Sequence, residues 1–314
     1  MSKKLWQPSL IVKKNSNLFA FENYISKKLK IKFNRNYKKL LNWSIKNSPE
    51  FWSRFWDFSK IKGIKSNKNF RKSKTFYKNL FLPGSRLNFG ENLLSKNNNE
   101  KAVTFISENG FREERSWRQL NLNTNKISKF LKKINIKKGD RVAAYMPNTI
   151  ETVEAFIATT SLGGIWSSCS PDFGSKGVIE RFSQINPKVL FITDQYFYNG
   201  KKIDVLKRLP EILKLIPSIK NVVISNYPGK KFIKNKHKLK KINLFKWNEL
   251  MQINVEKIDF KRFDFETELA ILYSSGTTGK PKCICHRSGG VLIQHMKEHQ
   301  LHCNIKENDN VFYF

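Results

Sequence analysis

Short apolar runs alternate with amphipathic stretches from Ala102 to Ser225, and this alternation limits the possible folds more than any other feature of the sequence. Four of the runs have the length of a buried strand: Arg141–Tyr145, Ile165–Cys169, Val189–Thr193 and Val222–Ser225. The intervening stretches show helical spacing and cover Glu151–Leu162, Lys176–Ile185 and a helical pair around Pro210. Strand–helix–strand units of this kind are joined by right-handed crossovers. The sequence therefore predicts an α/β fold with a mostly parallel sheet and helices on both faces.

The first hundred residues show a different pattern. Apolar residues recur at helical spacing over residues 17–28 and again over residues 37–47, without strand-length runs between them. We therefore predict two parts: an N-terminal helical and extended region over residues 1–100 that packs on the sheet, and an α/β domain over residues 101–314.

One helix of the N-terminal region is marked by an aromatic stripe. Ser48, Pro49 and Glu50 form a helix start, with Ser48 expected at the N-cap and an acidic residue in the first turn. The helix then carries four aromatic residues on one broad face: Phe51, Trp52, Phe55 and Trp56. A stripe at this spacing is more typical of a buried core than of a binding platform.

A glycine- and hydroxyl-rich loop is the strongest candidate for a functional site. The apolar run Leu269–Tyr273 reads as a strand, and a second short strand is expected over Cys283–His286. Between them lie Ser274, Ser275, Gly276, Thr277, Thr278 and Gly279, then a Lys-Pro-Lys step that ends at Lys282. Glycines let backbone N–H groups approach a polyphosphate, hydroxyls add donors, and a lysine compensates the charge. The loop therefore suits a polyphosphate, although a plain Ser/Gly turn between two strands has the same composition.

The spacing of this loop differs from a Walker A loop, because the pattern G-x-x-x-x-G-K-S/T is absent. The whole string I-L-Y-S-S-G-T-T-G-K-P-K, Ile271–Lys282, instead resembles the phosphate-binding signature of the adenylate-forming acyl-CoA synthetases. That resemblance implies the large N-terminal α/β domain of this family. It also implies a reaction in which ATP activates a carboxylic acid as an acyl-adenylate, whose acyl group passes to coenzyme A. In the family this loop binds the β- and γ-phosphates, and Mg²⁺ is expected to bridge them.

Further strings are similar to the acetoacetyl-CoA synthetase branch of the family. They are Gly164–Gly174, Val178–Pro187 and Gly289–Glu298, and Phe81–Leu94 is similar to both the acetyl- and the acetoacetyl-CoA synthetases. The resemblance implies acetoacetate, ATP and CoA as substrates, with acetoacetyl-CoA, AMP and pyrophosphate as products. The alternative within the family is acetate, propionate or another short acid.

A lysine pair is a second, weaker candidate site. Lys201 and Lys202 follow an Asn-Gly step after a strand end, where open α/β sheets place ligands. Related synthetases carry a basic residue near this point, so the resemblance implies that one of the two lysines meets a CoA phosphate. A solvated lysine pair is the plainer interpretation.

The net charge of +34 raises the alternative of a basic nucleic-acid-binding protein. The lysines are scattered with Asn and Ile along the whole chain, which favours a compositional bias that falls on solvated surface. Four cysteines form no dense disulfide pattern, and no apolar run approaches the length of a membrane span. We therefore expect a cytoplasmic protein with no membrane span and no specific nucleic-acid partner.

A metal site is a further alternative for the region after the loop. Cys283, Cys285, His286, His302 and Cys303 lack the usual zinc-ligand spacing. In a strand, Cys283 and Cys285 share one face, where we expect them to act as small apolar side chains. We therefore predict no metal site formed by the chain itself.

The end of the sequence reads as an apolar strand, Val311–Phe314, after a helix expected from Gly290 to about Cys303. Backbone groups of such a strand must be paired. The resemblance places the adenine, ribose and acyl contacts, the hinge and the catalytic lysine downstream. We therefore expect an N-terminal portion, a fragment that lacks the C-terminal half, does not complete the reaction alone and contains no securely assigned catalytic residue.

Overall fold

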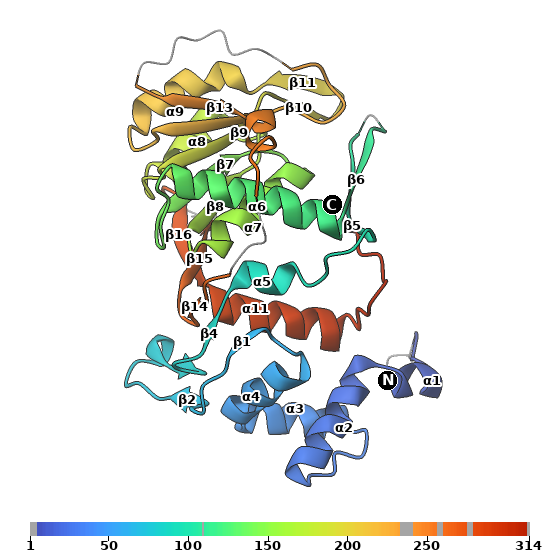
Figure 1. Ribbon diagram of the computed structural model, residues 1–314. Coiled ribbons are helices and arrows are strands. Elements are labelled where there is room, and N and C mark those ends of the chain that lie inside the picture. The colour runs from blue at the N-terminus through green and yellow to red at the C-terminus, as the bar shows by residue number, and fades with distance from the viewer. Residues whose placement is uncertain (1–4, 109, 233–240, 256–259, 275–278, 313–314) are drawn as a thin grey trace. The chain divides into compact units, whose positions relative to one another are not determined.

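The computed structural model describes residues 5–108, 110–232, 241–255, 260–274 and 279–312 (Figure 1). It contains two compact units, one formed by Met1–Leu87 with Gly289–Phe314 and the other by Asn88–Ser288. Compact units need not coincide with domains. The predicted boundary between residues 1–100 and residues 101–314 therefore stays a prediction.

The first unit is mainly helical. Its helices and short strands are α1 (Leu10–Lys14), α2 (Asn17–Leu29), α3 (Tyr37–Lys46), α4 (Ser48–Phe58), β1 (Gly63–Ile64), β2 (Phe70–Arg71), β3 (Leu80–Phe81), β4 (Arg86–Leu87) and a π-helix at Glu298–His302. α11 (Ser288–Lys297) begins at the last residue of the second unit. β1 pairs with β4, and β2 pairs with β3, both antiparallel.

Aromatic rings form the core of this unit, as the stripe predicts. Phe51, Phe55 and Trp56 are buried, and the Phe21 ring of α2 contacts both Phe51 and Phe55 edge-on at 5.6 Å between centroids. The predicted cap is wrong by one residue: Asn47 occupies the N-cap of α4 without a side-chain hydrogen bond, and Ser48 is already helical.

The second unit is built on a seven-stranded sheet with the order β13-β12-β9-β7-β8-β15-β16 (Figure 1). The strands are β7 (Arg141–Tyr145), β8 (Ile165–Cys169), β9 (Val189–Thr193), β12 (Asn221–Ser225), β13 (Asn243–Lys246), β15 (Glu268–Ser274) and β16 (Lys282–Arg287). All neighbours are parallel except β15 and β16, which form an antiparallel hairpin. This confirms the predicted α/β fold with a mostly parallel sheet.

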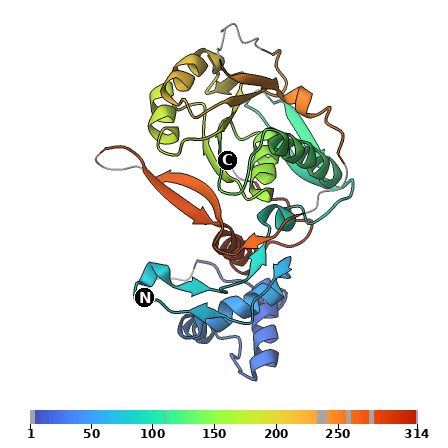
Figure 2. The ribbon, with the colours of Figure 1, turned by 60° about the vertical axis from the view of Figure 1, so that its left-hand side comes forward.

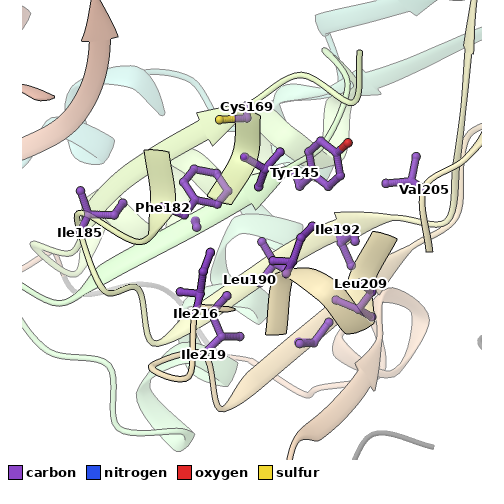
Figure 3. Packing of buried hydrophobic residues seen from close by; sticks show 14 of the residues in the cluster. Tyr145, Cys169, Phe182, Ile185, Leu190, Ile192, Val205, Leu209, Ile216 and Ile219 are labelled. Carbon is purple, nitrogen blue, oxygen red and sulfur yellow. The ribbon is translucent and has the colours of Figure 1, made fainter. Parts of the chain in front are cut away.

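Helices cover both faces because the inner strands are apolar on both faces. The helices of this unit are α5 (Phe89–Leu93), α6 (Trp117–Lys133), α7 (Ile150–Ser161), α8 (Ser175–Phe182), α9 (Leu209–Leu215) and α10 (Trp247–Leu250). Leu190 and Ile192 of β9 pack with residues of α8 and α9, as Figure 3 shows, whereas Phe191 between them contacts Trp247 of α10. Successive strand residues point to opposite faces, so one fully buried strand supplies the core on both sides.

A short hairpin and an edge strand of this unit were not predicted. β10 (Gln195–Tyr198) and β11 (Lys201–Asp204) form a separate antiparallel hairpin, and β13 lies at the edge of the sheet. The short strand β14 (Phe263–Asp264), which precedes β15, was not predicted either. A second hairpin, β5 (Lys101–Ile106) with β6 (Arg112–Ser116), precedes α6 and confirms the hairpin that the strand-like runs Ala102–Ser107 and Arg112–Arg115 predict.

Two further predictions, on where a helix ends and on a strand near the end of the sequence, are wrong. α8 ends at Phe182 rather than Ile185, because the chain turns and Asn186 takes a positive φ of 47° before Pro187. Val311 and Phe312 belong to no strand and are exposed by 65% and 84%, so the strand predicted at Val311–Phe314 is absent from its described part.

Candidate functional site

The phosphate-loop candidate joins β15 to β16. Its hairpin is the orange ribbon at the left of Figure 2. Ser274 and Lys282 are the last paired residues of the two strands, so the loop leaves the sheet between them. Ser275, Gly276, Thr277 and Thr278 lie outside the described residues, whereas Ser274 is half-buried and Lys282 is exposed.

Gly279 is the described glycine of the loop. Its φ is +109°, a conformation that residues with a side chain rarely adopt, and a Cβ atom added here would meet no other atom within 4 Å. The backbone therefore requires glycine here for its conformation, not for lack of space.

On the β15 side of the loop, hydrogen bonds join Tyr273 to α8 and β8. The Tyr273 hydroxyl donates to the Arg181 carbonyl at 3.2 Å and lies 3.1 Å from the Ser167 hydroxyl. Ser167 is fully buried in β8 and donates to the Ile271 carbonyl at 2.9 Å. Burial raises the pKa of Tyr273, so this hydroxyl stays protonated and can keep donating.

The far side of the loop is held by the chain that follows α8. Gln184 Nε2, in the turn that follows α8, donates to the Pro281 carbonyl at 2.9 Å and to the Glu180 carbonyl of α8 at 2.8 Å. The Arg181 guanidinium lies over the Phe173 ring at 4.3 Å and over the Tyr273 ring at 5.7 Å. Arg181 of α8 and Gln184 of the turn after it therefore contact the chain on the two sides of the loop.

A second loop, Ser170–Gly174, follows β8 at the carboxyl end of the sheet. Arg208 Nη1 donates to the carbonyls of Pro171 and Phe173 at 2.7 and 2.9 Å, and it also bonds to the Tyr145 hydroxyl. Because one guanidinium holds two carbonyls, the backbone of this loop is fixed against the core. The sequence singled out this string by resemblance, but Arg208 carried no signal in the sequence.

The lysine pair lies at the start of β11, after the turn that follows the end of β10. Asn199 and Gly200 make the turn, and their N–H groups donate to the Glu108 carboxylate at 2.9 and 3.3 Å. Lys201 pairs with Tyr198 and Lys202 with Phe197, and both lysines are exposed. Neighbouring residues of a strand point to opposite faces, so a ligand on one face meets only one of the two lysines.

A buried charge cluster, which the sequence analysis missed, lies between β6 and α7. Arg115 approaches Glu113 at 2.5 Å, Glu154 at 3.4 Å and Glu151 at 3.6 Å, and Asn123 of α6 donates to Glu154 at 2.8 Å. Burial raises the pKa of Glu154 to about 8 and also raises that of Glu151. Helical spacing of the two glutamates was visible in the sequence, but the arginine that faces them lies on another element.

A cavity of about 340 Å³ adjoins this cluster at the carboxyl end of β12. Its lining includes Glu113, Arg115 and Glu151 of the cluster, with Ser225 and Trp247. Three carboxyl groups surround one guanidinium here, so protonation of Glu154 lowers the excess of negative charge in the cluster.

The metal alternative finds no support in the described part of the chain. Those residues contain no group of three or more His, Cys, Asp or Glu side chains that could hold a metal ion. Cys283 and Cys285 do share one face of β16, but that face is exposed, so the expectation that they fill an apolar layer is wrong. In the same described residues, no helix is long and apolar enough to cross a membrane.

Comparison with known protein families decides what the chain is. The family described as AMP-binding enzyme matches residues 92–314. The chain belongs to this family. Among AMP-binding enzymes of known structure, an acetoacetyl-CoA synthetase from Streptomyces lividans superposes with a TM-score of 0.88 at 28% identity, covering 97% of this chain and 46% of that one.

Curated AMP-binding relatives agree with this match. The acetoacetyl-CoA synthetases of Xenopus tropicalis and Rhizobium meliloti are 37% and 36% identical over 100% and 99% of this chain, and the match covers 47% of each relative. A malonamoyl-CoA synthetase from Penicillium aethiopicum is 32% identical over 98% of the chain and 44% of its own length. The chain therefore spans about half the length of the curated relatives it matches.

Proposed function

We propose that this chain serves the ATP-dependent ligation of acetoacetate to coenzyme A through an acyl-adenylate. The observation that carries the proposal is that relatives named acetoacetyl-CoA synthetase match the chain over its whole length. The phosphate-loop candidate supports the ATP part of the proposal from the chemistry of its own residues.

The proposed phosphate contacts are Ser274, Ser275, Gly276, Thr277, Thr278, Gly279 and Lys282. Three described features fit this role: a half-buried hydroxyl at Ser274, a glycine-only conformation at Gly279 and an exposed lysine at Lys282. Each suits a group that must approach or neutralise phosphate oxygens. The loop would bind the β- and γ-phosphates and orient them for loss of pyrophosphate when the acid attacks the α-phosphate.

Mg²⁺ is the metal proposed to accompany ATP. Mg²⁺ is commonly held by substrate phosphates, a few waters and one or two protein oxygens. The described residues contain no protein cluster that could hold a metal, so the phosphates themselves and the hydroxyl of Ser274 would be its partners. Bound there, the ion would neutralise charge that develops on the departing pyrophosphate.

Coenzyme A is the proposed acyl acceptor, and Lys201 or Lys202 is proposed to meet one of its phosphates. Both lysines are exposed, as a contact with a charged ligand requires. They extend from a hairpin that follows the carboxyl end of β9, the end at which open α/β sheets bind ligands.

The test is pyrophosphate exchange into ATP, which reports adenylate formation. The chain, joined to the remaining part of the Streptomyces lividans synthetase, is given Mg²⁺, ATP, labelled pyrophosphate and one acid at a time. Acetoacetate is expected to support exchange better than acetate, propionate or malonamate. No exchange with any acid would contradict the proposed reaction, and a preference for another acid would change only the substrate.

The nucleic-acid alternative is tested on the 314-residue chain itself. Charge scattered over the surface is expected to retain nucleic acid weakly, without sequence preference, and to lose it at modest salt. Tight, sequence-selective binding well above physiological salt would favour that alternative.

A further inference from the structure

α8 and the turn that follows it contact the two stems of the phosphate-loop candidate. We define the first stem as Tyr273–Ser274 and the second stem as Gly279–Lys282. The first stem is joined to Arg181 by the Tyr273 hydroxyl, at 3.2 Å from the Arg181 carbonyl. The second stem is joined to Gln184 through the Pro281 carbonyl, at 2.9 Å. Two residues three positions apart therefore hold two segments that belong to opposite sides of the loop.

The second contact has a direct effect on Lys282. A peptide unit is planar, so the direction of the Pro281 carbonyl determines the direction of the Lys282 N–H. Proline also lacks an N–H, which leaves the carbonyl as its only backbone group for a hydrogen bond. Gln184 therefore orients the peptide plane from which the proposed phosphate lysine starts.

The first contact is backed by buried groups. Ser167, fully buried in β8, lies beside the Tyr273 hydroxyl and donates to the Ile271 carbonyl of β15. The Arg181 guanidinium lies over the ring at 5.7 Å and is held by the Gly177 carbonyl at 2.8 Å. The ring of Tyr273 is thus fixed by contacts from two elements.

Such contacts matter for a loop of this composition. Glycine-rich segments lose much conformational entropy when they are ordered, and donors for a phosphate must be held within about 0.5 Å of their working positions. The pairing of β15 with β16 ends at Ser274 and Lys282, so the strands alone do not order the loop beyond that pair.

We propose that Gln184, Arg181 and Tyr273 are positioning residues that hold the two stems for phosphate binding. This inference rests on the proposed function for the phosphate part, but the anchoring itself is a property of the fold. None of the three touches phosphate in this role: they act through Pro281, Ser274 and Lys282.

The test uses the 314-residue chain with two substitutions. Gln184→Met keeps the length and helix propensity of the side chain and removes the donor to Pro281. Tyr273→Phe keeps the ring and removes the hydroxyl. Gln294→Met is the matched control, because Gln294 is also an exposed glutamine whose side-chain amide donates a hydrogen bond, here to Glu298, outside the loop.

Two measurements are made on each variant. Titration calorimetry measures the dissociation constant for magnesium tripolyphosphate, and hydrogen exchange measures the opening rate of amides in residues 279–287. Gln184→Met and Tyr273→Phe each lose one hydrogen bond between neutral groups. In both variants we expect the dissociation constant for magnesium tripolyphosphate and the opening rate of these amides to rise by about fivefold. Two controls report general loss of structure: amide hydrogen exchange in Val189–Thr193 and the midpoint of denaturant unfolding. Both are expected to stay unchanged in the two variants.

The outcomes separate this inference from the proposed function. If the parent chain binds tripolyphosphate and both variants bind it equally well, the positioning role is wrong. If the parent does not bind it, phosphate binding fails, and exchange decides the anchoring: faster exchange in the two variants supports it, and unchanged exchange overturns it.

Discussion

The inner strands of the sheet and its outer hairpin differ in burial although they belong to one sheet. Every residue of β9 and β12 is buried, and both strands are paired on two sides. In the β15–β16 hairpin, Leu272 and Ile284 face each other and are exposed by 48% and 46%. β16 is the last strand of the sheet and has an unpaired edge in the described structure.

The difference separates strands that are buried on both faces from the hairpin that carries the candidate site. Inner strands are held by packing on both faces, so they are expected to tolerate little change. The hairpin carries the phosphate-loop candidate, and its residues are open to a ligand. Substitutions should therefore separate stability from function along the same sheet.

The largest expected effect tests burial directly, with the same substitution in both regions. Ile192→Ala removes a fully buried side chain of β9 and is expected to lower the free energy of unfolding by about 2–5 kcal/mol. Ile284→Ala in β16 is expected to cost less than about 1 kcal/mol, since that side chain is already half exposed. Denaturant unfolding measures both, and equal losses would contradict the comparison.

The second expected effect concerns ionisable groups. Burial raises the pKa of Glu154 to about 8, whereas Arg112 and Lys101 lower the pKa of exposed Glu114 by hydrogen bonds. The unfolded chain ionises Glu154 near pH 4.5, but the folded chain keeps it protonated until about pH 8. This residue therefore destabilises the fold increasingly as pH rises from about 4.5 to about 8, and its contribution is then constant.

Glu154→Gln removes this dependence and keeps an oxygen for the Asn123 bond. Relative to the parent, the variant is expected to gain stability between about pH 4.5 and 8, on the order of 5 kcal/mol at the upper end. Glu114→Gln, the control, is expected to show no such gain. Unfolding measured at about pH 5 and pH 8 checks the sign, and a constant difference between variant and parent would contradict it.

The third prediction tests whether a substitution in the hairpin lowers activity. In the fused synthetase, Lys282→Ala is expected to slow acetoacetate-dependent pyrophosphate exchange by roughly 10- to 100-fold, equivalent to about 1.5–3 kcal/mol for a charge-assisted phosphate contact. Lys280→Ala, two residues away and also exposed, is the control with a smaller expected loss. An unchanged exchange rate in Lys282→Ala would remove its assigned role.

The smallest expected effect concerns the lysine pair. Lys201 and Lys202 point to opposite faces of β11, so only one of the single substitutions to alanine should reduce the preference for CoA over its 3′-dephospho form. An exposed ion pair contributes about 1 kcal/mol or less, so a change of up to about fivefold is expected. Equal preferences in the parent and both variants would exclude a contact with that phosphate.

The sequence predicted the buried inner strands better than the exposed edge strand and the segment near Val311. β7, β8 and β9 lie where their apolar runs place them, because burial on both faces leaves an unbroken apolar signal. β13 is mostly exposed and follows a lysine-rich tract, so its pattern resembles a loop. The end at Val311 and Phe312 carries the apolar run of a strand without being one, since an apolar run alone does not supply a pairing partner.

The candidate site was predictable only in part, for a related reason. The loop was visible because its glycines and hydroxyls are consecutive in the sequence. Its anchors are not: Tyr273 and Arg181 are 92 residues apart, and Gln184 and Pro281 are 97 residues apart. Arg208 and Arg115 were missed in the same way, since a single sequence does not reveal which distant groups meet.

The hydrogen bond from Ser167 to Ile271 joins residues 104 positions apart, and this separation sets an order of events during synthesis. A ribosome that adds about 5–20 residues per second needs roughly 5–20 s to travel from β8 to β15. For that time β8 is an open edge of a nascent sheet, exposed to other chains. Among the described strands of this sheet, β15 and β16 are thus the last to join, and β15 covers the edge that β8 leaves exposed.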